Sequence, residues 1–504
     1  MAANRLQRAK YNIFSSLALQ IVSVICGLIV PRLLLGAFGS ETYGATSSIT
    51  QFLSYIALLE GGIGGVARAA LYKPLADGDN KRISAVVNEI KKFFFFVGLA
   101  FFLYVVVLSL SFKTISHVES LDWFSSFLLV WVISFSTFLQ YFVGLPYGLL
   151  LQADQKNYIS AIFSIIAVIL NTVLVFTLVK TNCSIIVIKF VSSIVFAIKP
   201  ILQNIYVKKR YTIIATEKNK NVLEQKWTGL GQHLAFFVHT NTDVVVLTIF
   251  GNLKMVAVYA VYNMVISNIQ NLTSAFSSGM EALFGELYAK DEKEQLNNTF
   301  SYYETLISIM TIILFSTTGI MIVPFVKLYT RGINDTNYIV PAFALILLLS
   351  SVLFCLRLPY HSLVIAAGQF KQTRMASYGE ALLNITLSII LVIKFDLIGV
   401  AIGTVVATTF RFLYYVSFLS KNIVGRPVWL FVKRLAINTT TFIIIMIIGY
   451  YVSSPMAINN NLEWIIISLL VVSISIAIAT ITNYFFYKDE VKAIFRRFGR
   501  RIGK

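Results

Sequence analysis

Apolar runs of about 20 residues, each long enough for a helix to cross a hydrocarbon core about 30 Å thick, recur along the whole chain between short polar segments. They lack the period-2 alternation of outer-membrane barrel strands. The pattern predicts an all-α integral membrane protein with about 14 transmembrane helices. The predicted spans are 12–36, 44–72, 93–112, 124–153, 159–179, 185–206, 232–250, 257–288, 302–326, 338–366, 375–393, 397–419, 435–453 and 463–487.

The composition agrees with this pattern. Hydrophobic residues make up 57% of the 504 residues and charged residues only 13%, whereas a soluble domain has about a quarter of its residues charged. The three cysteines lie far apart and form neither a CxxC pair nor a disulfide framework, so buried packing is expected for them.

The net charge of +19 is distributed unevenly along the chain. With both termini in the cytoplasm, the predicted inner segments contain 30 lysines and arginines and the outer loops contain 6. This positive-inside bias predicts an even number of spans and cytoplasmic termini. Because topology accounts for the charge, we expect the basic tail to contact membrane lipids and not nucleic acid.

Two halves of the chain resemble each other at a nearly constant offset. The offset is 213 residues for the first three pairs given below and 212 for the last. Six spans separate the copies, an even number, so the repeat is parallel and not inverted. The matching pairs are Pro146 and Pro359, Asn171 and Asn384, Leu174 and Leu387, and Lys199 and Arg411.

This repeat predicts the domain organisation. Two six-helix lobes are expected, joined by a basic polar loop and followed by two additional spans. The predicted parts are an N-lobe at 1–206, a cytoplasmic linker at 207–231, a C-lobe at 232–419, spans 13 and 14 within 420–487, and a basic cytoplasmic tail at 488–504.

Three stretches carry a family resemblance over nearly the full length. On these residues the chain resembles the polysaccharide-exporter branch of the multidrug/oligosaccharidyl-lipid/polysaccharide (MOP) flippase superfamily, the O-antigen and capsule repeat-unit flippases of bacteria. The stretches are Pro31-Arg32-Leu33-Leu34 with Phe38-Gly39 and Tyr43-Gly44, then Asn241-Thr242-Asp243 with Phe250-Gly251, Val256, Tyr259 and Tyr262, and finally Gly399-Val400-Ala401-Ile402-Gly403-Thr404.

The resemblance implies two six-helix lobes in a MATE-like V, a central cavity and alternating access. It implies translocation of an undecaprenyl-pyrophosphate-linked oligosaccharide repeat unit from the cytoplasmic to the outer leaflet, for O-antigen, capsule or exopolysaccharide biosynthesis. The implied location is the bacterial cell (inner) membrane. The implied partners are the lipid-linked oligosaccharide, membrane lipids, and the polysaccharide polymerase and glycosyltransferases of the same pathway.

Six cations lie inside the predicted spans. An ionisable group at membrane depth is costly, so by default it faces a cavity or a partner. Fixed cations can replace the hydration shell of a pyrophosphate, and arginine can do so bidentately. For Lys189, Arg68 and Arg32, which lie nearer the ends of their spans, snorkelling to the membrane surface is the alternative reading. The predicted substrate-binding cations are Lys199, Arg411, Arg357, Arg32 and Arg68.

Carboxylates inside the spans are candidates for coupling or for ion pairing. Asp243, Glu60 and Glu281 form this group. A buried carboxylate such as Asp243 can bind Na⁺ or take up a proton. Na⁺ or H⁺ is therefore the candidate coupling ion, and no other cofactor is predicted. The alternative for Asp243 is an ion pair with an Arg or Lys of the cavity, and of the two readings the ion pair is expected.

Motifs of enzymes are absent from the sequence. It contains no P-loop GxxxxGK[ST], no HExxH and no GxSxG, and its four histidines do not cluster. We therefore predict a transporter without catalytic or metal-binding residues. Two alternatives stay open: a cation-coupled multidrug exporter of the same superfamily, and a membrane enzyme or polymerase of the same pathway. The exporter predicts a cavity rich in carboxylates, whereas six cations in the spans face five candidate acids, which are Glu60, Asp243, Glu281, Glu286 and Glu380 when the first turns of the spans 302–326 and 463–487 are left aside.

Overall fold

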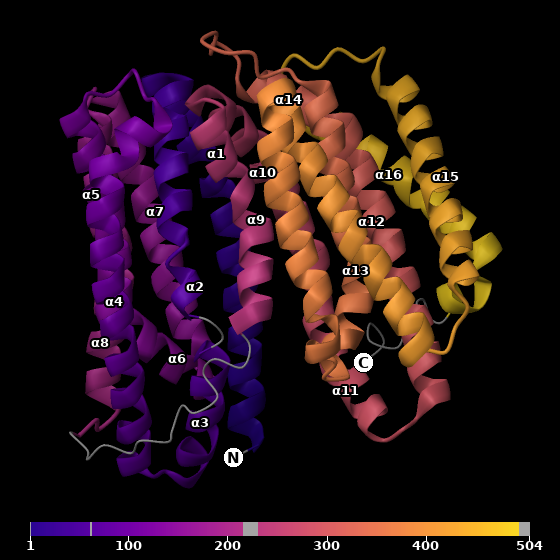
Figure 1. Cartoon of the computed structure of the whole chain (residues 1–504), viewed down its shortest axis with the longest axis horizontal. Coiled ribbons are helices and arrows are strands. Elements are labelled where there is room, and N and C mark those ends of the chain that lie inside the picture. The colour runs from indigo at the N-terminus through magenta and orange to yellow at the C-terminus, as the bar shows by residue number, and fades with distance from the viewer. Residues whose placement is uncertain (1, 61–62, 215–229, 493–504) are drawn as a thin grey trace. The chain divides into compact units, whose positions relative to one another are not determined.

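The computed structural model describes residues 2–60, 63–214 and 230–492 (Figure 1). Every regular element within these ranges is a helix, and ten helices there are long and apolar enough to cross a membrane. Two of the ten contain a residue with non-helical backbone angles and correspond to more than one predicted span. The predicted class, an all-α multi-pass membrane protein, is confirmed.

The chain divides into two compact units, residues 1–237 with 252–257, and residues 238–251 with 258–504. Two helices, α9 (Leu230–Phe250) and α10 (Leu253–Ser274), contribute residues to both units. The first unit also contains α1 (Ala2–Ser54), α2 (Ala57–Glu60), α3 (Ile63–Asp77), α4 (Asn80–Ser116), α5 (Trp123–Leu139), the π-helix η1 (Gln140–Gly144), α6 (Leu145–Ala153), α7 (Asn157–Lys180) and α8 (Ile185–Arg210).

In the second unit, α12 is a central element that packs against α11, α13, α15 and α16. Gly449 allows close packing of α15 on α12, since a Cβ atom at this position would lie 2.4 Å from Cδ1 of Ile320. An aromatic core that includes Phe284, Phe300 and Tyr303 holds α11 to α12 and α13. The helices of this unit are α11 (Ser277–Ala289), α12 (Lys293–Tyr329), α13 (Pro341–Ala366), α14 (Phe370–Asn422), α15 (Val428–Ser453) and α16 (Asn461–Phe486).

Some predicted spans are joined in the structure. Helix α1 runs through 12–36 into the next span with a single interruption at Gly39, whose φ of 77° lies in the region that favours glycine. Helix α14 joins the predicted spans 375–393 and 397–419 through Asp396, which has φ 49°. Aspartate is one of the few other residues that tolerate positive φ. One residue with unusual backbone angles therefore replaces each predicted loop.

Other predicted spans are broken. The span 44–72 is divided among α1, α2 and α3, and the span 257–288 between α10 and α11. The span 124–153 is confirmed as one continuous segment, Trp123–Ala153, in which η1 ends two residues before Pro146. Because proline has no backbone N–H, the i→i−4 ladder is disturbed here, and a π-helical turn is a common accommodation.

Candidate functional site

Three charged residues form a buried triad inside the second unit. Glu380 on α14 is fully buried and lies between Arg357 on α13 and Arg411, also on α14. Nη1 of Arg357 lies 2.5 Å from Oε1 of Glu380, and Nη1 of Arg411 bonds to Oε2. The structure thus brings two of the predicted substrate-binding cations together. One carboxylate serves both of them, so the triad has a net formal charge of +1.

Aromatic groups complete the surroundings of this triad. Nε and Nη2 of Arg411 donate to the hydroxyl of Tyr415, at 3.2 and 2.9 Å. His361 stacks on the Tyr415 ring with centroids 5.8 Å apart, and the Arg357 guanidinium lies over the ring of Phe354. Arg411 is only 2% exposed. Its donors are therefore used inside the protein in this conformation.

The carboxylate of Asp243 on α9 is held by hydroxyl groups. Oγ1 of Thr404 lies 2.9 and 3.1 Å from its two oxygens, and the Tyr259 hydroxyl donates to Oδ2 at 3.1 Å. Asp243 is 4% exposed, and within the described ranges no cation lies within ion-pair distance of it. The expected ion pair of Asp243 with Arg or Lys is thus not the arrangement of this structure, because α14 places Thr404 against the carboxylate instead.

Further oxygen atoms lie around this carboxylate. Nδ2 of Asn384 donates to Oγ1 of Thr404 at 2.9 Å, while Oδ1 of the same amide is buried and has no hydrogen-bond partner. Oγ of Ser388 lies 3.4 Å from the carbonyl oxygen of Val400, which also accepts from Thr404. The result is a compact set of carboxylate, amide, hydroxyl and carbonyl oxygens, which are the ligands that hard cations prefer.

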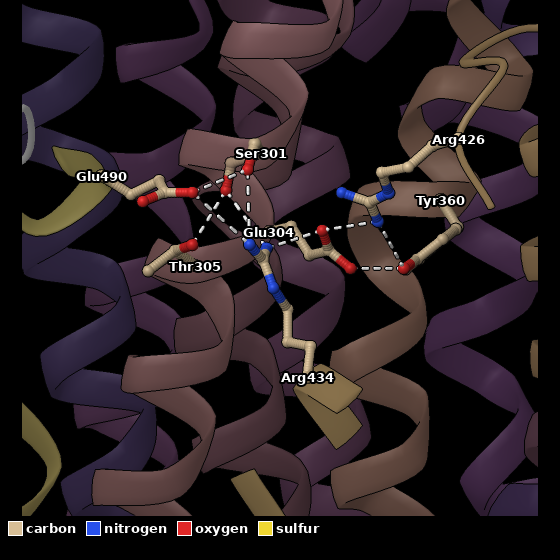
Figure 2. A network of polar contacts seen from close by, with 7 residues as sticks. All are labelled: Ser301, Glu304, Thr305, Tyr360, Arg426, Arg434 and Glu490. Atoms are coloured by element: carbon tan, nitrogen blue, oxygen red, sulfur yellow. Dashed lines mark hydrogen bonds and ion pairs between the residues drawn. The ribbon is translucent and has the colours of Figure 1, made fainter. Parts of the chain in front are cut away.

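A second charged network surrounds Glu304 on α12 (Figure 2). Nη1 of Arg434 on α15 lies 2.6 Å from Oε2 of Glu304, and Nη2 of Arg426 lies 2.9 Å from the same atom. The Tyr360 hydroxyl bonds to the other carboxylate oxygen, and Glu490 accepts from the Ser301 hydroxyl at 3.1 Å. The network therefore ties α15 and the segment after α16 to α12 and α13.

An apolar groove lies in the second unit. Its volume is about 650 Å³, and α12, α13 and α15 line it. On α15 the lining residues extend from Asn438 to Tyr451, a length of roughly 20 Å at 1.5 Å per residue. Nearly all of the lining is apolar, with Leu348 on α13 and Met446 on α15 as examples. The groove has the chemistry of a site for a hydrocarbon chain.

The remaining predicted residues lie apart from these clusters. In the first unit, Nη1 of Arg68 donates to Oε1 of Gln152 at 2.8 Å, and the Tyr141 hydroxyl bonds to Glu60. Arg32 on α1 and Lys199 on α8 are half-buried. In the second unit, Oγ of Ser362 lies 3.5 Å from Oε1 of Glu281. No ion pair involving Lys199 is formed within the described residues.

A charged cluster at the start of the 207–231 loop lies outside the spans. Asp154 bonds to Lys156 at 2.6 Å, to Arg8 at 3.3 Å and to the hydroxyl of Tyr211. Burial and the hydrogen bond to Asp154 raise the pKa of Tyr211, so the phenol stays protonated and donates. The cluster fixes the end of α8 to the turn before α7 and to the start of α1.

Two features of the site are absent from the sequence-based prediction, the Glu304 network and the close contact between Asp243 and Asn384. Glu304 lies two residues inside the predicted span 302–326, which is a usable signal for a partnered carboxylate. Arg434 falls among the predicted cytoplasmic cations, because the predicted span 435–453 begins one residue after it. The recurrence of Asn171 and Asn384 in the two halves is the signal for the second feature.

Comparison with known proteins gives a match by structure only. No family model matches the chain, and no curated protein matches it by sequence.

Several solved transporters share the fold. A lipid II flippase, MurJ, in an inward closed conformation has a TM-score of 0.71 at 17% identity, over 95% of this chain and 99% of the other. An inward-facing MATE multidrug resistance transporter of the MOP superfamily has a TM-score of 0.63 at 14% identity, over 81% and 98%. The MATE multidrug transporter DinF-BH has a TM-score of 0.59 at 16% identity, over 82% and 95%. The chain is thus a multi-pass membrane protein with the fold of these flippases and transporters.

Proposed function

We propose that this protein is a flippase that moves an undecaprenyl-pyrophosphate-linked oligosaccharide from the cytoplasmic to the outer leaflet by alternating access. The observation that carries the proposal is the apolar groove of about 650 Å³ between α12, α13 and α15. A polyprenyl tail needs an apolar path while its polar headgroup crosses the membrane. A groove roughly 20 Å long accommodates part of such a tail.

The buried cations supply the second requirement, a counter-charge for the pyrophosphate. Arg411 is held by Glu380 and Tyr415, so contact with a phosphate requires exchange of Glu380 for the substrate. Lys199 forms no ion pair with any described residue and is available without such an exchange. We propose Lys199 and Arg411 as the pyrophosphate-binding pair, with Lys199 contacting the substrate first.

The Asp243 cluster supports a coupling role. Asp243, Asn384 and Thr404 would hold a monovalent cation, and the buried Oδ1 of Asn384 without a partner fits such a site. A bound Na⁺ or proton would supply the positive charge that neutralises the carboxylate. The residues themselves connect α9 to α14, so cation binding would change how firmly these two helices are held together.

A test of the proposal fills the groove. Thr439→Trp and Met446→Trp place an indole in the groove, and we expect both to stop surface polysaccharide production and to cause a lipid-linked repeat to accumulate in the cytoplasmic leaflet. Ile448→Trp is the matched control, because Ile448 is on the same helix, is 41% exposed and does not line the groove. Normal export by both groove variants at wild-type expression would refute the proposal.

A cation-coupled multidrug exporter is the second candidate. It is favoured by the likeness to MATE multidrug transporters, which extends over 81% and 82% of this chain. The two functions are separated by an efflux assay with a cationic fluorescent dye in cells that lack other exporters. Efflux that Asp243→Asn abolishes, without accumulation of any lipid-linked sugar after deletion of the gene, would favour the exporter.

A further inference from the structure

A cavity in the first unit is lined by residues that the internal repeat places opposite those of the Asp243 cluster, with different chemistry. It has a volume of about 330 Å³ and is lined by α1, α7 and α8. The offset of 212–213 residues between the two halves maps this lining onto the cluster of the second unit. The corresponding pairs are Pro31 and Asp243, Asn171 and Asn384, Val175 and Ser388, Ile188 and Val400, Lys189 and Ala401, and Ser192 and Thr404.

The asparagines behave alike in the two places. Asn171 is 7% exposed, and its Oδ1 is buried without a hydrogen-bond partner, as is Oδ1 of Asn384. Each amide is accompanied by a hydroxyl, Ser192 in the first unit and Thr404 in the second. A buried amide oxygen without a partner is costly. Other asparagines share this feature, but Asn171 and Asn384 have it at equivalent positions of the repeat, so each place offers an acceptor to a donor or a cation.

The charges are reversed between the two places. Where the second unit has the carboxylate of Asp243, the first has Pro31. Where the second has the small buried Ala401, the first has Lys189, which lines the cavity. In the described part of the chain, no carboxylate lies within ion-pair distance of Lys189. An ammonium group has three hydrogen-bond donors and no acceptor, so it suits a cavity that contains an acceptor without a partner, here Oδ1 of Asn171.

We propose that the first unit contains a degenerate copy of the cation site in which the ammonium of Lys189 takes the place of the exchangeable cation. This inference rests on the cation site proposed for Asp243. It follows that, of these two equivalent places among the described residues, only the one in the second unit binds an exchangeable cation, while the charge of the first is fixed. Pro31 suits the fixed charge, since a carboxylate there would bind Lys189 and neutralise it.

Lys189 also lines a neighbouring cavity of about 420 Å³ in the same unit. The lining of that cavity is mostly apolar but includes hydroxyl and amide groups, among them Thr50, Ser136 and Gln140. The lysine therefore lies in the wall between two cavities. A fixed cation in this position leaves the second cavity with a positive edge whatever the external cation concentration.

The test counts bound Na⁺. The purified full chain in lipid nanodiscs is dialysed to equilibrium against radioactive Na⁺, and the ions bound per chain are measured. We expect one for the wild type, one for Pro31→Asp because the new carboxylate pairs with Lys189, and two for Pro31→Asp/Lys189→Ala. The matched control, Pro31→Asn/Lys189→Ala, has no carboxylate and should bind one.

Two results overturn the inference: a second Na⁺ bound by Pro31→Asp with Lys189 intact, or no additional Na⁺ in the double variant. If Pro31→Asp does not fold, Val175→Asp/Lys189→Ala replaces the double variant, with Val175→Asp and Val175→Asn/Lys189→Ala as its comparisons. Adding Asp243→Asn to each variant separates the two sites. An ion lost when Asp243→Asn is added is assigned to the Asp243 site. The difference in bound Na⁺ between the variants with and without Lys189→Ala tests the role of Lys189 alone. This difference can be measured even if the wild type binds no Na⁺.

Discussion

Thr404 donates its hydroxyl to the carboxylate of Asp243, 161 residues earlier in the chain, with Oγ1 2.9 Å from Oδ1. Thr404 belongs to α14 and Asp243 to α9. The same Oγ1 also lies 2.9 Å from Nδ2 of Asn384. A single hydroxyl thus connects a buried carboxylate to a buried amide, and the site proposed for the coupling cation depends on this connection.

Asp243→Asn should abolish stabilisation by Na⁺, because the charge that would hold the cation is lost. A ligand at 100 times its dissociation constant stabilises the folded state by about 2.7 kcal/mol. We therefore expect the wild type to melt at a higher temperature in NaCl than in choline chloride, and the variant to melt equally in both. Thr404→Val should weaken Na⁺ binding by about tenfold, as expected for one lost hydrogen bond. An unchanged sodium effect in Asp243→Asn would contradict the assignment.

Glu380→Gln should be the most destabilising single change in the buried triad. It leaves Arg357 and Arg411 charged and without a counter-charge, and breaking a buried pair in this way costs about 3–5 kcal/mol. Arg411→Ala should cost less, because Arg357 continues to pair with Glu380. Thermal unfolding in detergent gives the order of stability. As a control, Lys290→Ala, in an exposed pair with Glu286, should leave the melting temperature unchanged.

The Glu304 network should fasten α15 to α12. Glu304→Gln, Arg434→Ala and the double variant form a double-mutant cycle, for which we expect a coupling free energy of about 0.5–3 kcal/mol, as for directly contacting residues. As a control, a second cycle combines Glu304→Gln with Tyr484→Phe instead of Arg434→Ala, and this cycle should show no coupling free energy. A coupling near zero for Glu304 and Arg434 would mean that apolar packing alone holds α15.

The predicted topology places the N-terminus, the 207–231 loop and the C-terminus in the cytoplasm. In a chain without its native cysteines, single cysteines at Asn219 and Gly503, positions outside the described residues, should react with an impermeant thiol reagent only after permeabilisation. Native Cys183, kept alone, is the control, since it lies in a predicted outer loop and should react in intact cells or spheroplasts. Labelling of Asn219→Cys in intact cells would refute the map.

Lys199→Glu should insert at normal levels yet abolish surface polysaccharide, because it replaces the proposed pyrophosphate contact with a like charge. Lys199→Arg should retain export, since the positive charge survives. Lys199→Ala should weaken substrate binding by about ten- to a hundredfold, as expected for a charge-assisted contact of about 1.5–3 kcal/mol. Quantifying surface polysaccharide at matched expression provides the measurement. If Lys199→Ala and Arg411→Ala together export normally, this pair does not bind the pyrophosphate.

The sequence by itself determined the class of protein, and it predicts the direction of the spans. Runs of apolar residues and the predicted bias of 30 inner against 6 outer cations are properties of local sequence. Insertion into a membrane depends directly on such properties. The offset of 213 residues between Asn171 and Asn384 likewise indicates an internal repeat from residue positions alone. The predicted boundaries are wrong near Gly39 and Asp396, where backbone geometry and not hydropathy decides how a helix continues.

Only the tertiary structure decided which charged groups meet. Arg357 and Arg411 are 23 and 31 residues from Glu380 along the chain, and composition gives no reason to pair them over other buried ions. From the sequence Asp243 is expected to pair with a cation, whereas in the structure it accepts from the hydroxyl groups of Thr404 and Tyr259. Its partner follows from how α9 packs on α14, because burial requires each polar group to find its bond within a few ångströms. Sequence therefore predicts that a buried charge has a partner, and packing selects the partner.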